Sequence, residues 1–233
     1  MDVLTIILSL LPGFAWLIFY LREDMHPEPK RLIIFVFIVG MASAWFALAV
    51  EILAKSFIAG TSFAGMSLLK TASIATLSWL LIMALIEEAI KFGAAYLAIH
   101  KNPEFDEPID AMIYMVVAAL GFATVENIGA LTGSPGQTAI LSSAFTLTSL
   151  RFVGATLLHT LASAIVGYYW ALGIRTMKTR QYLWIGLLAA TVLHGIFNYL
   201  ILVYGNLIYS VIFLLVVGFF VLSDFERLRH RKI

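Results

Sequence analysis

The sequence predicts an all-α, polytopic membrane protein, and two observations indicate this fold class. First, 61% of the 233 residues are hydrophobic and 12% are charged, whereas an average soluble domain has about 45–50% apolar and 25% charged residues. Second, the apolar residues form continuous runs of the roughly 20 residues that a membrane-spanning helix needs, without the alternation of a membrane β-strand. These features exclude a soluble globular protein and a disordered chain.

Seven apolar runs are predicted to cross the membrane as helices. We do not expect the first to be a cleaved signal peptide, because Asp2 stands where a basic start would be and no small-residue cleavage site follows. A weaker run, residues 137–149, follows Gly133-Ser134-Pro135-Gly136, and we expect it to form a short interfacial or re-entrant helix. No repeat or linker divides the chain, so residues 1–233 are expected to form one membrane domain. The predicted spans are residues 3–21, 32–53, 76–99, 109–131, 150–174, 182–204 and 206–222.

Lys and Arg residues collect on one predicted side of the membrane. Loops 22–31, 100–108 and 175–181 and the C-terminal tail carry most of them, whereas the opposite side carries only Lys55 and Lys70. Because basic loops stay in the cytoplasm, we expect an external N-terminus and a cytoplasmic C-terminus. The formal net charge of +1 offers no basic surface for nucleic acid. The absence of cysteine excludes disulfides, cysteine-bound zinc and thiol catalysis.

The third run contains three charged residues within five positions, Glu87, Glu88 and Lys91. Ionisable side chains are costly in hydrocarbon, so each one is a candidate functional residue. Lys91 lies one helical turn from both carboxylates and can neutralise one of them. A single Glu–Lys pair is more commonly an ion pair between helices, but the second carboxylate suits a general base. We predict catalytic roles for Glu87 and Glu88, with Glu88 mainly paired to Lys91.

The fourth, fifth and sixth runs each contribute a further ionisable residue. Glu126, in the fourth run, could be a site residue or simply bond a Ser or Thr of a neighbouring helix. His159 and His194 lie well inside separate runs and could bind a metal or transfer protons. Counted from the outer ends of their helices, Glu87, Glu126 and the two histidines lie roughly 8–17 Å deep. Side chains at such overlapping depths can meet in one cavity.

Four other polar residues lie in or near these runs. Asn198 is one turn beyond His194 and could orient a carbonyl group or stabilise an oxyanion. Asn127 follows Glu126 directly. Arg151 and Glu51 lie near the ends of their runs, where a long side chain can reach the membrane surface.

Two mechanisms fit this set of residues. Glu126, His159 and His194 could be the three ligands of a catalytic zinc ion with an open position for water, and Glu87 or Glu88 would then accept the water proton. No H-E-x-x-H sequence is present, so such a site must be assembled from separate helices. Alternatively, a Glu–His pair could activate water without a metal.

Five short motifs follow one another along the chain from about residue 20 to residue 200. They are Asp24 with Pro27-Glu28-Pro29, similar to D-x-x-P-E-P; Glu87-Glu88-Ala89-Ile90-Lys91, matching E-E-x-x-K; Gly121-Phe122-Ala123 with Glu126-Asn127, similar to G-F-A-x-x-E-N; Arg151 with His159; and His194-Gly195 with Asn198, similar to H-G-x-x-N. Taken in this order, the motifs resemble those of the PrsW intramembrane protease family and make the resemblance fairly specific. Related CAAX-protease and bacteriocin-processing proteins carry His where this chain has Glu126, so their metal-free mechanism stays open here.

The resemblance implies an integral protein of a prokaryotic cell membrane that hydrolyses a peptide bond. PrsW proteins make the first cut in an anti-sigma factor on its extracytoplasmic side, so the implied partner is a single-span membrane protein within the lipid bilayer. It also makes Arg151 and Asn127 more plausible as supporting site residues. The alternative reading is an ion- or proton-coupled transporter, but no inverted repeat or pair of broken helices is present. A seven-span receptor would need no Glu–Glu–His–His cluster.

Overall fold

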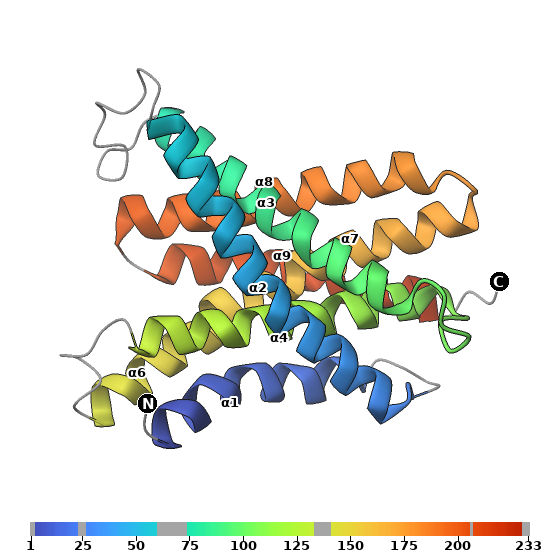
Figure 1. Ribbon diagram of the computed structural model, residues 1–233, viewed down its shortest axis with the longest axis horizontal. Helices are drawn as coiled ribbons and strands as arrows, with labels where there is room; N and C mark the ends of the chain where they lie inside the picture. The colour runs from blue at the N-terminus through green and yellow to red at the C-terminus, as the bar shows by residue number, and fades with distance from the viewer. Residues whose placement is uncertain (1–2, 23–26, 60–73, 133–140, 206, 230–233) are drawn as a thin grey trace.

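The computed structural model describes residues 3–22, 27–59, 74–132, 141–205 and 207–229, and every regular element in them is helical. The helices run lengthwise in one bundle (Figure 1). Their bounds are α1 (Val3–Tyr20), α2 (Lys30–Ala59), α3 (Ile74–Ile99), α4 (Pro108–Thr132), α6 (Leu141–Arg151), the π-helical segment η2 (Phe152–Thr156), α7 (Leu157–Arg175), α8 (Thr179–Tyr204) and α9 (Leu207–Arg229).

Helix α4 forms the centre of the bundle. It contacts α1, α2, α3, α7 and α9, and almost all of its side chains are buried. Glycines allow α2 to approach it closely: a Cβ atom at Gly121 would lie 2.1 Å from the Phe37 carbonyl oxygen, and one at Gly40 would lie 2.1 Å from the Ala118 carbonyl oxygen. Small residues permit this approach between membrane helices.

Six helical stretches are long and apolar enough to cross a membrane, and large apolar side chains such as Phe219 are exposed on the outside of the bundle. The remaining long helix, α3, has 26 residues and is also largely apolar, but it contains three charged residues, Glu87, Glu88 and Lys91. It packs against α2, α4, α7 and α8. The polytopic helical bundle expected from the sequence is therefore confirmed, and α3, the helix with these three charged residues, corresponds to the third predicted span.

The structure places the predicted short helix differently from expectation. Residues 137–140 lie outside the described part of the chain, but residues 141–149 belong to α6. Helix α6 continues without a break through η2 into α7, and residues Phe145–Arg175 together are long enough to cross the membrane. The described part of the weak run, residues 141–149, therefore leads into the fifth span as part of one long irregular helix.

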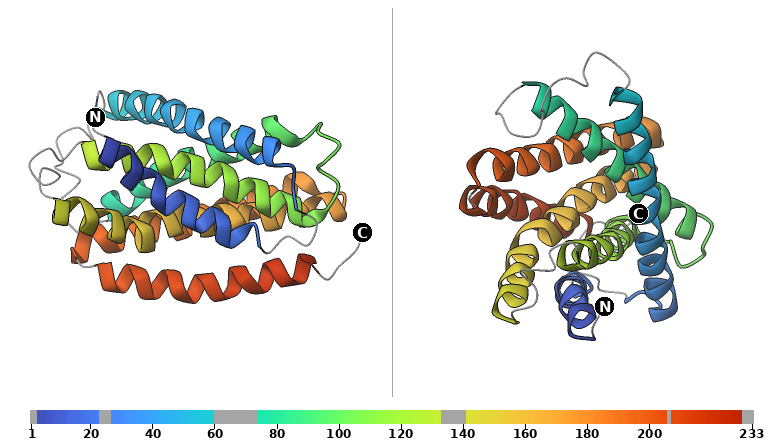
Figure 2. Two further views of the ribbon diagram at one scale, coloured as in Figure 1. Left: turned by 90° about the horizontal axis from the view of Figure 1, so that it is seen from below. Right: turned by 60° about the vertical axis from the view of Figure 1, so that its left-hand side comes forward.

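The two ends of the bundle differ in charge. Helix α1 begins at one end and α9 finishes at the other (Figures 1 and 2), as an odd number of passes requires. The α1–α2, α3–α4 and α7–α8 connections lie at the end where α9 finishes. Lys30, Lys101, Lys178 and Arg227 belong to this basic end.

The Pro27-Glu28-Pro29 motif also lies at the basic end. The Tyr114 hydroxyl group donates a hydrogen bond to Glu28, which ties the motif to α4. At the same end, Asp110 Oδ2 accepts the backbone N–H groups of Asp106 and Glu107 at 3.0 and 2.7 Å, and so caps the start of α4. The hydrogen bond from Tyr114 thus holds the Pro27-Glu28-Pro29 motif against the central helix α4, away from the histidines.

Candidate active site

Helix α3 carries three charged side chains toward the inside of the bundle. Lys91 Nζ donates to Glu88 Oε1 at 2.8 Å and lies 3.4 Å from Glu87 Oε2. The side chains of Lys91 and Glu88 are completely buried, whereas 11% of the Glu87 side chain is exposed. Because neighbouring turns align residues three and four apart, one face of α3 holds both carboxylates and their counter-ion.

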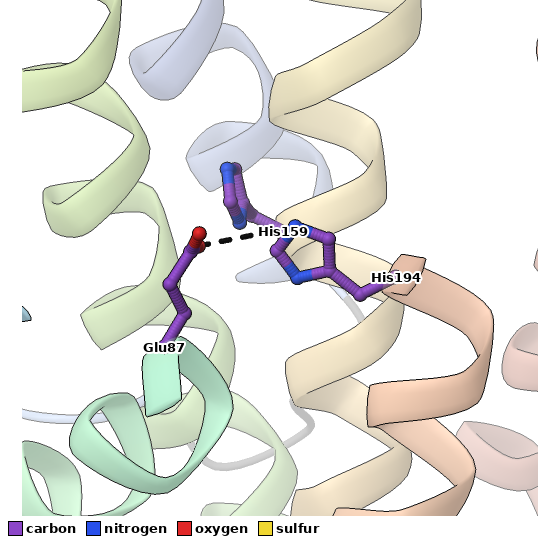
Figure 3. Close-up of side chains that lie close together, drawn as sticks. All are labelled: Glu87, His159 and His194. Atoms are coloured by element: carbon purple, nitrogen blue, oxygen red, sulfur yellow. Dashed lines mark ion pairs between the residues drawn. The ribbon is translucent and has the colours of Figure 1, made fainter. Parts of the chain in front are cut away.

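The two predicted histidines meet Glu87 at this face. His159 comes from α7 and His194 from α8, and both are buried. Their ring centroids are 5.2 Å apart, with the ring planes nearly perpendicular. Figure 3 shows Glu87, His159 and His194 pointing toward one another from three helices, with 3.8 Å between Glu87 Oε2 and His194 Nε2.

Hydrogen bonds fix the orientation of both imidazole rings. His194 Nδ1 lies 2.8 Å from Glu88 Oε1. Because an ionised carboxylate only accepts, Nδ1 carries a hydrogen, and Nε2 is the nitrogen that faces Glu87. His159 Nδ1 lies 2.7 Å from Lys91 Nζ. An ammonium group only donates, so this nitrogen accepts.

Glu126 reaches His159 from the other side of the ring. Its Oε2 lies 2.7 Å from His159 Nε2 and 3.6 Å from Arg151 Nη2. Arg151 Nε donates to Asn127 Oδ1, and Asn127 Nδ2 donates to Thr156 Oγ1 at 3.2 Å. The predicted supporting residues Arg151 and Asn127 therefore lie next to the histidine cluster and contact it through Glu126.

The π-helical segment explains why Arg151 and His159 meet the same carboxylate. In a regular α-helix, residues eight positions apart point about 80° away from each other. A π-turn accommodates one extra residue, so η2 brings the two side chains onto nearly the same face. Trp16 Nε1 of α1 donates to the Phe152 carbonyl oxygen of this segment at 2.9 Å.

The group that could hold a metal differs from the predicted one. The sequence suggested Glu126, His159 and His194, but the ligand atoms that lie within 4.8 Å of one another belong to Glu87, His159 and His194. Glu126 instead hydrogen-bonds the Nε2 atom of His159, because it approaches the ring from α4, on the side away from Glu87. In this arrangement Glu126 contacts His159 and is not one of the three grouped residues.

The sequence predicted that the Glu51 side chain reaches toward the membrane surface, but the structure brings its carboxyl group to the cluster. Glu51 of α2 has a side chain that is only 16% exposed, and its carboxyl group interacts with that of Glu87 as well as with Lys55, at 3.9 Å. The predicted span ended at residue 53, but α2 extends to Ala59. Glu51 therefore lies about 12 Å of helix before the end of α2.

Asn198 is the one predicted catalytic residue that the structure does not bring into the cluster. It lies one turn beyond His194 on α8 and is partly exposed. Among the described residues, its side chain makes no hydrogen bond to the carboxylates or histidines. A role in binding the substrate carbonyl group stays a prediction.

The donor set fits a catalytic zinc ion. One carboxylate and two imidazoles are the protein ligands of many catalytic zinc sites. The second nitrogen of a zinc-bound histidine usually donates to a carboxylate, and Glu88 provides this contact for His194. The Lys91 ammonium group, however, lies against His159 Nδ1.

Comparison with known proteins identifies the family. Residues 28–223 match the family described as PrsW family intramembrane metalloprotease. Over 194 residues the chain is 31% identical to Protease PrsW of Geobacillus kaustophilus (strain HTA426), covering 82% of this chain and 76% of that protein. Over 202 residues it is 25% identical to Protease PrsW of Bacillus subtilis (strain 168), covering 85% and 83% respectively.

No solved structure is significantly similar to the chain. The family match covers most of the residues and includes all four helices that carry the cluster, α3, α4, α7 and α8. Together with the apolar helices, it makes this an integral membrane protein. The chain belongs to the PrsW family of intramembrane proteases.

Proposed function

We propose that this protein hydrolyses a peptide bond of a single-span membrane protein near the outer membrane face, with Glu87 as the central acidic residue. The observation that carries this proposal is the contact of Glu87 with His194 inside a buried cluster built from four helices. A buried carboxylate facing an imidazole nitrogen can hold and activate a water molecule for attack on a carbonyl group.

The two neighbouring glutamates have different surroundings, which supports different roles. Glu88 is completely buried, and one of its oxygens accepts from both Lys91 and His194. Glu87 makes longer contacts, at 3.4 Å to Lys91 and 3.8 Å to His194, and part of its side chain is exposed. Glu87 is therefore the carboxylate that a water molecule or a substrate can reach, and Glu88 positions His194.

We further propose that zinc takes part in the reaction. Glu87, His159 and His194 would hold the ion, which would supply a Lewis acid for the scissile carbonyl group. Glu126 would keep His159 oriented, since its carboxylate lies 2.7 Å from Nε2. Arg151, 3.6 Å from Glu126, would hold that carboxylate in its ionised, hydrogen-bond-accepting form.

The cutting side follows from charge and depth. Glu126 and His194 lie nearer to the end of the bundle opposite the basic loops, roughly 9 and 15 Å from the ends of α4 and α8. The basic end is expected to face the cytoplasm, so the cluster would lie in the outer half of the membrane. An anti-sigma factor, the substrate class suggested by the sequence motifs, presents such a single span.

The decisive experiment uses purified protein in liposomes with a single-span test substrate. The Glu87→Gln variant keeps the side-chain volume, and we expect it to lose at least about 10²-fold of the cleavage rate, the size of a general-base effect. Metal analysis distinguishes the two possible roles of Glu87. Loss of bound zinc together with activity identifies a ligand, whereas loss of activity alone identifies the base. Undiminished cleavage by the variant would refute the proposed mechanism.

A further inference from the structure

Lys91 has an unusual position for a lysine in a membrane-spanning protein. Its Nζ atom lies 2.7 Å from His159 Nδ1, 2.8 Å from Glu88 Oε1 and 3.4 Å from Glu87 Oε2. It also lies 4.4 Å from the centre of the Phe122 ring, and none of the side chain is exposed. The ammonium group is thus held by two of the three residues that could bind a metal.

This position conflicts with a metal ion at His159. A metal binds the lone pair of an imidazole nitrogen. His159 Nε2 faces the Glu126 carboxylate and Nδ1 accepts from Lys91. A metal shared with Glu87 and His194 must therefore replace the ammonium group at Nδ1.

Charge leads to the same conclusion. An ammonium group beside a divalent ion is strongly repelled inside a protein, where charges are poorly screened. Without a metal, Lys91 compensates the charge of the α3 carboxylates. When a metal binds, the flexible four-carbon stem allows the ammonium group to move away from His159 while it stays close to Glu88, one turn earlier on the same helix.

We propose that Lys91 and a divalent metal ion are mutually exclusive occupants of the Glu87–His159–His194 cluster, with Lys91 as the resident cation that a metal must displace. This inference rests on the zinc site proposed above. Lys91 would then lower the affinity for metal. Without metal, the protein folds with its buried carboxylates compensated by Lys91, and it binds metal more weakly than the three ligands would without the lysine.

The test measures zinc binding rather than cleavage. Chelator-treated protein is titrated with zinc by calorimetry, and its melting temperature is measured with and without zinc. In Lys91→Met the charge is removed and the length is kept. We expect this variant to bind zinc at least about tenfold more tightly than the unchanged protein, because a repelling charge is gone. Without zinc it should melt at a lower temperature, since buried carboxylates lose their counter-ion, and zinc should restore most of the difference.

Two further variants complete the test. Lys101→Met changes an exposed lysine at the basic end and should leave both measurements unchanged. Lys91→Gln, which keeps a hydrogen-bond donor, should raise zinc affinity in the same direction and replaces Lys91→Met if that variant does not fold. Unchanged or weaker zinc binding by the Lys91 variants, or no binding by any protein, would overturn the inference. Zinc binding by the Lys91 variants alone would support the inference and would refute the proposal that the unchanged enzyme uses zinc. The Glu87→Gln cleavage assay tests proteolysis separately.

Discussion

Replacement of Glu88 tests whether this residue positions His194 or acts on the substrate. Glu88 Oε1 accepts from Lys91 and from His194, each at 2.8 Å, and Oε2 accepts from Ser163 at 3.4 Å. In Glu88→Gln an amide of the same shape keeps one acceptor but loses the charge. The ring of His194 then loses its charge-assisted hydrogen bond, and Lys91 loses its closest counter-ion.

The structure sets the expected size of both effects. Hydrogen bonds to charged groups contribute about 1.5–3 kcal/mol each. Because the amide oxygen retains one neutral bond, we expect Glu88→Gln to lower the free energy of unfolding by about that amount. Glu88→Ala leaves the buried ammonium group with only its longer ion pair to Glu87, at 3.4 Å, and should cost more than Glu88→Gln, up to about 3–5 kcal/mol. Loss of a carboxylate that orients a histidine typically lowers metal affinity or activity by about 10–100-fold.

The assay combines chemical unfolding in micelles with cleavage of the single-span substrate in liposomes. Ser163→Ala removes only the longest contact of Glu88 and serves as the matched control, with both measurements close to those of the unchanged protein. If folded Glu88→Gln is as inactive as Glu87→Gln, then Glu88 acts on water or substrate directly. If it is as stable and active as the unchanged protein, the positioning role is refuted.

Three further predictions follow from the topology and the packing. A reporter at Ile233 should read cytoplasmic and one at Ser134, outside the described residues, should read external, because basic loops stay inside; reversed readings would move the cut to the other membrane face. Glu126→Gln should slow cleavage by about 10–100-fold while zinc is retained, because Glu126 contacts His159 rather than the metal position. Loss of zinc in this variant would instead show that Glu126 is a zinc ligand. Gly121→Ala should lower the melting temperature, since its Cβ atom would lie 2.1 Å from a carbonyl oxygen of α2. Gly129→Ala is the control and should not lower it, because no atom lies within 4 Å of the added Cβ atom. Equal stability of the two variants would contradict the close α2–α4 approach.

The long helix from Leu141 to Arg175 has one feature that its sequence predicts and one that it does not. Its apolar composition predicts a span, but its sequence gave no indication that η2 would interrupt the regular hydrogen bonding. Another helix contacts this segment, because the Trp16 indole group of α1 donates a hydrogen bond to the Phe152 carbonyl oxygen. Without the turn, Arg151 and His159 would point in different directions and could not both approach Glu126.

The amino-acid sequence alone predicted the membrane helices and most of the ionisable residues that meet in the cluster. Long apolar runs have no stable alternative to spanning the bilayer, and ionisable residues within them must face the interior of the bundle to find partners. How these residues pair became visible in the folded structure: Glu87 with His194, Glu126 with His159, Lys91 between the carboxylates and His159, and Glu51 beside Glu87. Pairing depends on how each helix is rotated and how closely it approaches its neighbours. Side chains from distant parts of the chain set these quantities together, so local spacing cannot specify them.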